Sequence, residues 1–226
     1  MKRYLILLVL FLQLHTAAQP NRKIVDLPDG DGPFPVLLIA PAKQYSMKEH
    51  LFQRLAEEAV KQGYMVVRFD WEFFTKGEEP SENLESEASQ LDQMIEFSRS
   101  HPQSSGKVFL AAKSFGTVVA ARKAWRSVEG VLLWTPNSNR ELQFGDIYGD
   151  LLKSSTPTHI VISVTDPYGE LSQLYDYLTN TSAAVTVHTL FGDHNFQTDP
   201  PDDGLNEDAA FAGSVNWLLR YRPDAP

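Results

Sequence analysis

The sequence predicts an α/β fold, a three-layer α/β/α sandwich in which helices cover both faces of a mainly parallel sheet. Short apolar segments alternate with longer amphipathic segments along the chain, which is typical of strands and helices that follow one another. Several short segments are apolar without interruption, as expected of strands buried on both faces. No internal repeat and no linker divides the 226 residues, so we expect a single domain.

Three strands and one helix are expected before residue 70. Residues 21–27 form a short first strand, which ends at a cluster of Pro, Asp and Gly at 28–33. Residues 36–40 (Val-Leu-Leu-Ile-Ala) form a buried strand. Residues 47–62 carry apolar side chains at helical spacing and are followed by a glycine, and residues 64–69 form the next strand.

The middle of the chain repeats this alternation. Residues 70–80 show no period and are expected to be irregular, whereas residues 82–100 form an acidic amphipathic helix whose charges face solvent. Strands are expected at 108–111 and 130–134, because both segments are short and apolar. A helix at 117–127 lies between them.

The last part of the chain contains two further strands, at 159–164 and 184–190, and two amphipathic helices, at 171–179 and 209–221. Only about two dozen residues separate the strand that ends at Trp134 from the next strand. This leaves little room for a lid, so the sequence predicts no cap domain and a rather open site.

Residues 1–18 have the pattern of a secretory signal peptide. Two cations precede an apolar run from Tyr4 to Leu12, and small residues at 16–18 provide a cleavage site after Ala18. The alternative is a membrane anchor, but the run is shorter than the roughly 20 apolar residues of a spanning helix. We therefore expect a periplasmic or secreted protein, with a soluble mature domain of residues 19–226 that has no stable membrane insertion.

The composition excludes several classes of function. The 20 Lys and Arg residues and 29 Asp and Glu residues give a net charge of −9, which disfavours a nucleic-acid partner because phosphates are repelled. The chain has no cysteine, so a cysteine nucleophile and a thiolate metal site are excluded. No histidine has a neighbour at metal-ligand spacing, and we expect neither a metal nor another cofactor.

Ser114 lies between a predicted strand and a predicted helix, in the segment Ala112-Lys113-Ser114-Phe115-Gly116. This resembles a nucleophile elbow, usually G-x-S-x-G, in which small residues on both sides let the strand and the helix approach. A serine at the start of a helix is also a common N-cap. With a helix N-terminus behind the serine, the N–H of Phe115 would face a developing oxyanion.

An acid and a histidine follow later strands, in the order that such an elbow requires. Asp166 and His194 each come directly after a predicted strand, and the carboxyl ends of parallel strands meet at one edge of the sheet. The pattern predicts that Ser114 attacks a carbonyl, that His194 accepts its proton and that Asp166 orients the imidazole. Asp193 is the competing acid, but adjacent side chains rarely face each other, so we expect it to have a turn or supporting role.

A second oxyanion donor is expected at the end of the strand 36–40. Pro41 has no N–H, so Ala42 is the better candidate and Lys43 is the next. We also place Lys43 in the substrate pocket.

Three further residues are candidates for that pocket. Lys113, beside the serine, would favour an anionic substrate, or would be a lysine that faces solvent. Asp70 follows a strand and lines the pocket, or belongs to an ordinary solvated loop. Trp71 forms an apolar wall for an acyl or alkyl group, or covers the edge of the sheet.

Three motifs carry a resemblance to a known family. They are Arg-Phe-Asp-Trp-Glu-Phe at 68–73, Thr-Asp-Pro-Tyr-Gly at 165–169 and Gly-Asp-His-Asn-Phe at 192–196. With them, the chain from about Val36 to Tyr221 resembles a small alpha/beta hydrolase without a cap. It is most similar to the dienelactone-hydrolase-like group and, within that group, to the KANL/Tex-type hydrolases. The resemblance implies a triad of Ser114, Asp166 and His194 and an esterase-like hydrolysis.

The sequence therefore predicts a serine hydrolase that cleaves a small-molecule ester or thioester through an acyl-enzyme. The alternative is a non-catalytic protein with the alpha/beta-hydrolase fold that binds a ligand or a partner. It is motivated by Ala40-Pro41, which stands where the family usually has His-Gly, and Ala112 likewise replaces the first glycine of the elbow. A peptidase is less favoured, because no second domain is present to select peptides.

Overall fold

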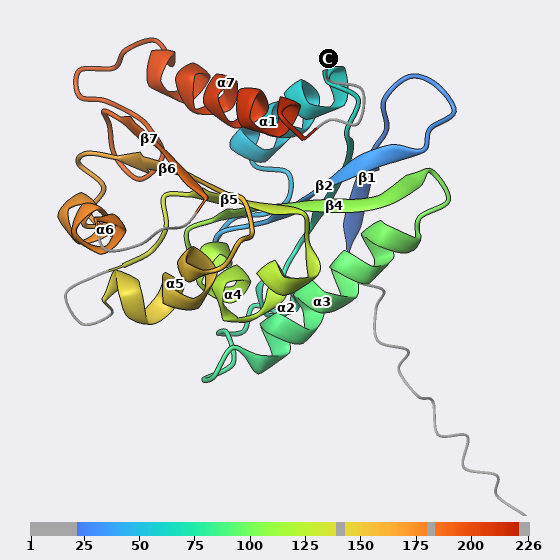
Figure 1. Ribbon diagram of the computed structural model, residues 1–226, viewed down its shortest axis with the longest axis horizontal. Coiled ribbons are helices and arrows are strands. Elements are labelled where there is room, and N and C mark those ends of the chain that lie inside the picture. The colour runs from blue at the N-terminus through green and yellow to red at the C-terminus, as the bar shows by residue number, and fades with distance from the viewer. Residues whose placement is uncertain (1–21, 139–142, 180–183, 222–226) are drawn as a thin grey trace, which may run out of the picture.

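The computed structural model describes residues 22–138, 143–179 and 184–221, and its centre is a seven-stranded sheet (Figure 1). The strand order is β1-β3-β2-β4-β5-β6-β7, and every neighbouring pair is parallel except β1 with β3. The strands are β1 Lys23–Asp26, β2 Phe34–Ala40, β3 Met65–Phe69, β4 Ser104–Lys113, β5 Gly130–Trp134, β6 Thr158–Ser163 and β7 Val185–Leu190.

Helices cover both faces of the sheet. Figure 1 shows α1 (His50–Lys61) and α7 (Leu205–Leu219) on one face, and α3 (Glu85–Ser100), α4 (Phe115–Arg122) and α5 (Phe144–Lys153) on the other. Helix α6 (Leu171–Leu178) packs beside α5. Each face has its own apolar core, so the predicted three-layer α/β/α sandwich is confirmed.

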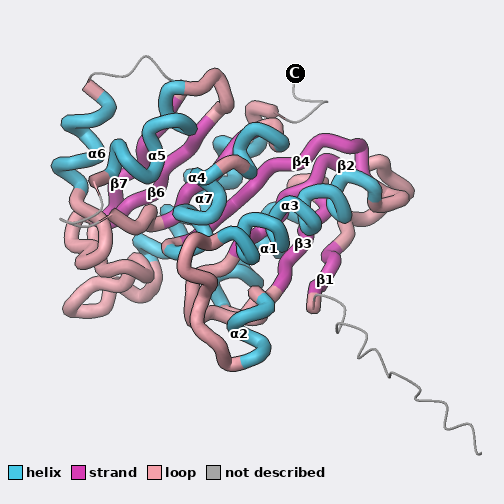
Figure 2. The backbone as a smooth tube through the Cα atoms, turned by 90° about the horizontal axis from the view of Figure 1, so that it is seen from below, coloured by secondary structure: helices cyan, strands magenta, loops and turns pink. Residues whose placement is uncertain are grey.

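The central strands are apolar because they are buried on both faces. Residues 36–38 of β2 and all of β5 are fully shielded from solvent or nearly so. The parallel pairing of β2 with β4 places Ala40 opposite Ala112, and that of β6 with β7 places Ser163 opposite Leu190. Figure 2 shows the strands side by side from β1 to β7. The residues that follow β2, β4, β6 and β7 therefore lie along one edge of the sheet.

Two helices lie where none was predicted. Helix α2 (Glu72–Lys76) falls in the segment expected to be irregular; it forms because Phe73 packs into the core and Gly77, at φ +69°, ends the helix after a single turn. Helix α5 lies between β5 and β6, with Phe144, Tyr148 and Leu151 buried on one side. Within the described residues, α5 is the main element of this connection, and no separate domain caps the sheet edge.

Other boundaries differ by a few residues. The helix predicted at 117–127 is α4 followed by a short 3-10 helix, Ala124–Ser127. Helix α7 begins four residues earlier than predicted, because the Asp202 carboxylate accepts hydrogen bonds from the backbone N–H groups of Gly204 and Asn206. Strand β4 begins at Ser104, which pairs with Phe34.

The signal-peptide prediction concerns residues 1–18, which lie outside the described residues. Among the helices that are described, none is long and apolar enough to cross a bilayer.

Candidate active site

Ser114 sits in a strained turn between β4 and α4. Its backbone has φ 50° and ψ −115°, a combination that a residue with a side chain rarely adopts and that costs about 1–3 kcal/mol. The turn is held by two backbone hydrogen bonds, from the N–H of Ser114 to the carbonyl of Trp134 (3.0 Å) and from the N–H of Thr117 to the carbonyl of Ser114 (2.9 Å). The strain raises the serine side chain above the end of the sheet, as a nucleophile elbow does.

Gly116 lets the helix pass close to the neighbouring strand. A Cβ atom at this position would lie 2.6 Å from the carbonyl oxygen of Ala40 and 2.8 Å from that of Pro41, which is closer than real Cβ contacts allow. Ala112, on the other side of the serine, is buried and is accommodated where a glycine is usual. The steric requirement of the elbow is therefore strict after the serine and weaker before it.

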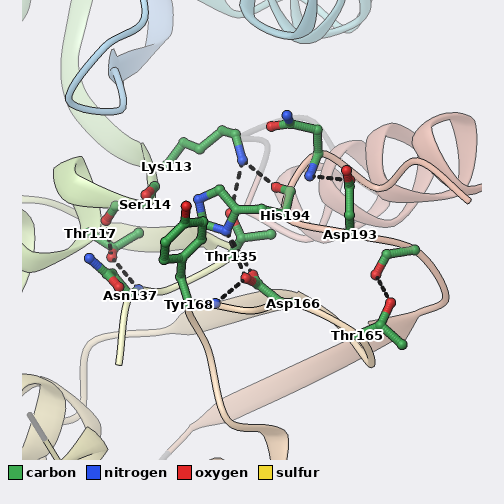
Figure 3. A network of polar contacts seen from close by, with 12 residues as sticks. Lys113, Ser114, Thr117, Thr135, Asn137, Thr165, Asp166, Tyr168, Asp193 and His194 are labelled. Atoms are coloured by element: carbon green, nitrogen blue, oxygen red, sulfur yellow. Dashed lines mark hydrogen bonds and ion pairs between the residues drawn. The ribbon is translucent and has the colours of Figure 1, made fainter. Parts of the chain in front are cut away.

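His194 and Asp166 form a hydrogen-bonded pair. The Nδ1 atom of His194 lies 2.9 Å from both carboxylate oxygens of Asp166. The Asp166 side chain has no solvent exposure and also accepts a hydrogen bond from the N–H of Tyr168 (2.8 Å), so its position is fixed. Figure 3 shows the imidazole between Ser114 and the Asp166 carboxylate. A carboxylate at Nδ1 holds the proton there, which leaves Nε2 able to accept another.

The loop after β7 is shaped to present His194. Gly192, at φ +110°, has no room for a Cβ atom, which would lie 2.8 Å from backbone atoms of Phe196 and Gln197. The Asp193 carboxylate accepts hydrogen bonds from the N–H groups of Asn195 (2.7 Å) and Gln197 (3.1 Å). The turn role expected for Asp193 is confirmed, and Asp166 is the acid that contacts the histidine.

Ser114 and His194 line one groove of about 510 Å³. Phe115 and Ala42, the expected oxyanion donors, line it too. The N–H of Phe115 is the first of helix α4 and has no acceptor within the helix. In the described part of the chain, the N–H of Ala42 has no backbone acceptor. Two backbone donors are thus available beside the serine hydroxyl.

This geometry agrees with the comparisons to known proteins. The family model of the alpha/beta hydrolase domain matches residues 35–217. The chain belongs to the alpha/beta hydrolase family. The solved structures described below share this fold, and the narrower resemblance to the dienelactone-hydrolase-like group stays a prediction. No match is found among curated proteins.

Among solved structures, three alpha/beta hydrolase folds illustrate the likeness. A lidless alpha/beta serine hydrolase from Xanthomonas campestris has a TM-score of 0.68 and 21% identity, with 90% of each chain covered. An alpha-beta serine hydrolase homologue from Coxiella burnetii has a TM-score of 0.65 and 18% identity, with 88% of this chain and 90% of that one covered. Est1E from Butyrivibrio proteoclasticus, with ferulic acid bound, has a TM-score of 0.67 and 12% identity, with 87% of this chain and 95% of that one covered.

The residues predicted to line the substrate pocket fall in two places. Lys43 lines the groove, where its ammonium pairs with Glu79 on the surface. Asp70 is buried outside the groove: its side chain accepts a hydrogen bond from the N–H of Met47 (2.6 Å) and so holds the loop before α1. Asp70 therefore supports this loop and does not line the groove.

Trp71 and Lys113 also lie outside the groove, each for a physical reason. Trp71 is fully buried, packs edge-on against Phe115 and donates from Nε1 to the carbonyl of Pro41 (2.9 Å), so it supports the strand end that carries Ala42. The Lys113 side chain reaches toward Thr135 and the backbone of His194 and is only 1% exposed. Lys113 was predicted either to contact the substrate or to face solvent, and it does neither.

Sequence reasoning missed six groove residues: Gln44, Tyr45, Asn137, Pro167, Tyr168 and Asn195. The Tyr45 hydroxyl donates to the side-chain oxygen of Asn195 (2.7 Å) and so joins the loops after β2 and β7, and burial raises the pKa of this phenol. The Tyr168 ring lies edge-on to the His194 imidazole, with 4.9 Å between centroids. Asn137 and Tyr168 follow the ends of β5 and β6, at the sheet edge where ligands bind in parallel sheets. This position in the sequence could have identified them as groove residues.

No group of three metal-ligating side chains occurs among the residues that the structure describes.

Proposed function

We propose that this hydrolase is a carboxylesterase-like serine hydrolase that cleaves an ester or thioester through an acyl-enzyme on Ser114. The observation that carries the proposal is the 2.9 Å pairing of His194 Nδ1 with the buried Asp166 carboxylate, in a groove that also contains Ser114 on its strained turn. An N-cap serine would need neither the strain nor the histidine.

The proposed reaction has two halves. The Ser114 hydroxyl adds to the carbonyl carbon of the ester, while Nε2 of His194 takes its proton and Asp166 stabilises the imidazolium. The oxyanion accepts hydrogen bonds from the N–H groups of Phe115 and Ala42, and the alcohol leaves with the proton from His194. Water then attacks the acyl-enzyme with His194 as base, which releases the acid and restores the serine.

The groove supports a compact substrate. It is lined by the rings of Tyr45, Phe115 and Tyr168 together with amide side chains, which suits a short or planar acyl group with polar substituents. The ferulic acid held by Est1E is a ligand of that kind, so hydroxycinnamate esters belong in the substrate panel with p-nitrophenyl esters of increasing acyl length.

The test is covalent labelling with a fluorophosphonate probe, which reacts with an activated serine. We expect the wild-type chain to be labelled, Ser114→Ala to be unlabelled, and Ser89→Ala, at an exposed position of α3, to be labelled like the wild type. His194→Ala should slow the labelling at least about 100-fold. Labelling that is absent from the folded wild-type chain, or that survives in Ser114→Ala, would refute the proposal and favour the non-catalytic alternative.

A further inference from the structure

Lys113 is a buried cation without a buried anion in contact with it. It is the last residue of β4, directly before Ser114, and only 1% of it is exposed. The aromatic rings of Tyr45 and Phe196 lie 5.9 and 5.7 Å from its ammonium nitrogen. Within the described residues it forms no ion pair, although Asp166 and Asp193 are near enough to act on its charge.

The amino group of Lys113 has two neutral acceptors. Nζ donates to the hydroxyl oxygen of Thr135, at 2.9 Å, and to the backbone carbonyl of His194, at 2.7 Å (Figure 3). Thr135 follows β5 and His194 follows β7, so one side chain connects the ends of three strands. The contact with His194 joins residues 81 positions apart in the sequence.

Burying a charge in this way is costly, and burial lowers the pKa of Lys113 to about 7. An apolar side chain of similar length would fill the space between the two rings without that cost. An apolar side chain has no hydrogen-bond donor, however, and so would not hold the carbonyl of His194. The loop of His194 has its own turn bonds, through Asp193, but these act within the loop and do not tie it to the elbow.

We propose that Lys113 is a positioning residue that fastens the main chain of His194 to the serine elbow, so that the imidazole stays aligned with Ser114. The proposal rests on the serine-hydrolase function proposed above. Lys113 does not touch the substrate or the reacting atoms; it acts through the carbonyl of His194. Alignment of this kind matters because a displacement of about 1 Å can lower a rate about 100-fold.

Two pairs of variants test this. Lys113→Met keeps the length and removes both hydrogen bonds, with the exposed Lys107→Met on the same strand as control. Thr135→Val removes only the acceptor beside Nζ and loosens the lysine, with Thr135→Ser, which keeps the hydroxyl, as control. We expect Lys113→Met to lower kcat for a p-nitrophenyl ester at least about tenfold with KM within about twofold, and Thr135→Val to lower kcat severalfold. Both controls should behave like the wild type.

A second measurement does not depend on activity. Nitrogen-15 NMR of the His194 ring reports the tautomer and the proton on Nδ1, with Asp166→Asn as the reference for a lost pair. In Lys113→Met we expect this signal to broaden or to move toward that reference. If the wild-type chain is not labelled by fluorophosphonate, the proposed function fails while this comparison still decides the role of Lys113.

If Lys113 only filled space, Lys113→Met would leave kcat and the His194 signal unchanged, whatever its effect on the thermal midpoint. Unchanged kcat together with an unchanged His194 signal in Lys113→Met would overturn the proposal. If this variant does not fold, wild-type kcat in Thr135→Val would overturn it instead.

Discussion

Replacing Lys113 by methionine should stabilise the fold near neutral pH. The pKa of Lys113 is lowered from 10.5 to about 7, so in wild type the folded chain carries a penalty for the buried charge. At pH 7 this penalty amounts to about 4 kcal/mol, and at pH 9 to about 2 kcal/mol, because the unfolded chain keeps the proton up to its pKa of 10.5. Methionine removes the penalty and also removes two hydrogen bonds, worth about 1 kcal/mol each.

The pH dependence has a definite sign. Between pH 7 and 10.5 the unfolded wild-type chain binds one proton that the folded chain has released, so wild-type stability rises with pH through this window. The variant lacks this contribution. We therefore expect Lys113→Met to be about 2 kcal/mol more stable than wild type at pH 7 and about equally stable at pH 9.

The assay is urea unfolding of both chains at pH 6, 7, 8 and 9, followed by tryptophan fluorescence. Taking the difference between the two chains cancels the titration of all groups they share. Lys107→Met, on the exposed part of the same strand, is the matched control and should show no trend with pH. A difference between wild type and Lys113→Met that stays constant from pH 6 to 9 within about 0.5 kcal/mol would refute the reasoning, because it would mean that burial does not expel the proton.

Two further predictions concern the packing around the site and the far end of the sheet. Gly116→Ala should destabilise the fold by about 1–3 kcal/mol and lower activity, because the new Cβ atom would press on the carbonyls of Ala40 and Pro41. Thermal unfolding measures this, with Ala112→Gly as the comparison. An unchanged thermal midpoint in Gly116→Ala would contradict the prediction. His159 is buried and stacked on Trp217, and burial, together with His188 and Arg220, lowers its pKa to about 4. The unfolded chain therefore binds a proton at a higher pH than the folded chain does. Stability should fall by about 3 kcal/mol as the pH drops from about 6.5 to about 4. His159→Phe should remove that part of the acid sensitivity in urea unfolding, and equal pH trends for the two chains would speak against it.

The sheet and the order of the site residues could be predicted because they depend on local signals. An uninterrupted apolar run such as Val-Leu-Leu-Ile-Ala identifies a strand that is buried on both faces, and the parallel arrangement then decides which loops meet. Asp166 and His194 lie in the loops that follow β6 and β7, so the strand topology alone was enough to predict that they meet. Helix α2 lacked such a signal, because five residues are too few to show a helical period.

What could not be predicted was the direction in which side chains near the elbow turn. A lysine beside a nucleophilic serine has a long flexible stem, and the sequence does not indicate whether its ammonium reaches solvent, substrate or backbone. The direction is decided by Thr135 and by the carbonyl of His194, which come from two other strand ends. Trp71 and Asp70 were misplaced for the same reason, since their partners are backbone groups of the loop after β2.

These buried polar contacts share one feature that bears on how the site works. Trp71 holds the carbonyl of Pro41, beside the proposed oxyanion donor, and Lys113 holds the carbonyl of His194, beside the proposed base. Both side chains donate to main-chain carbonyls, so each contact constrains the position of a whole loop. A hydrogen bond between two side chains would constrain only their rotamers. In the described part of the connection between β5 and β6, α5 is the main element, and no lid is seen there that could close and align the groups upon substrate binding. An open site of this kind must have its geometry set in advance, and two buried donors aimed at loop carbonyls are a direct way to set it.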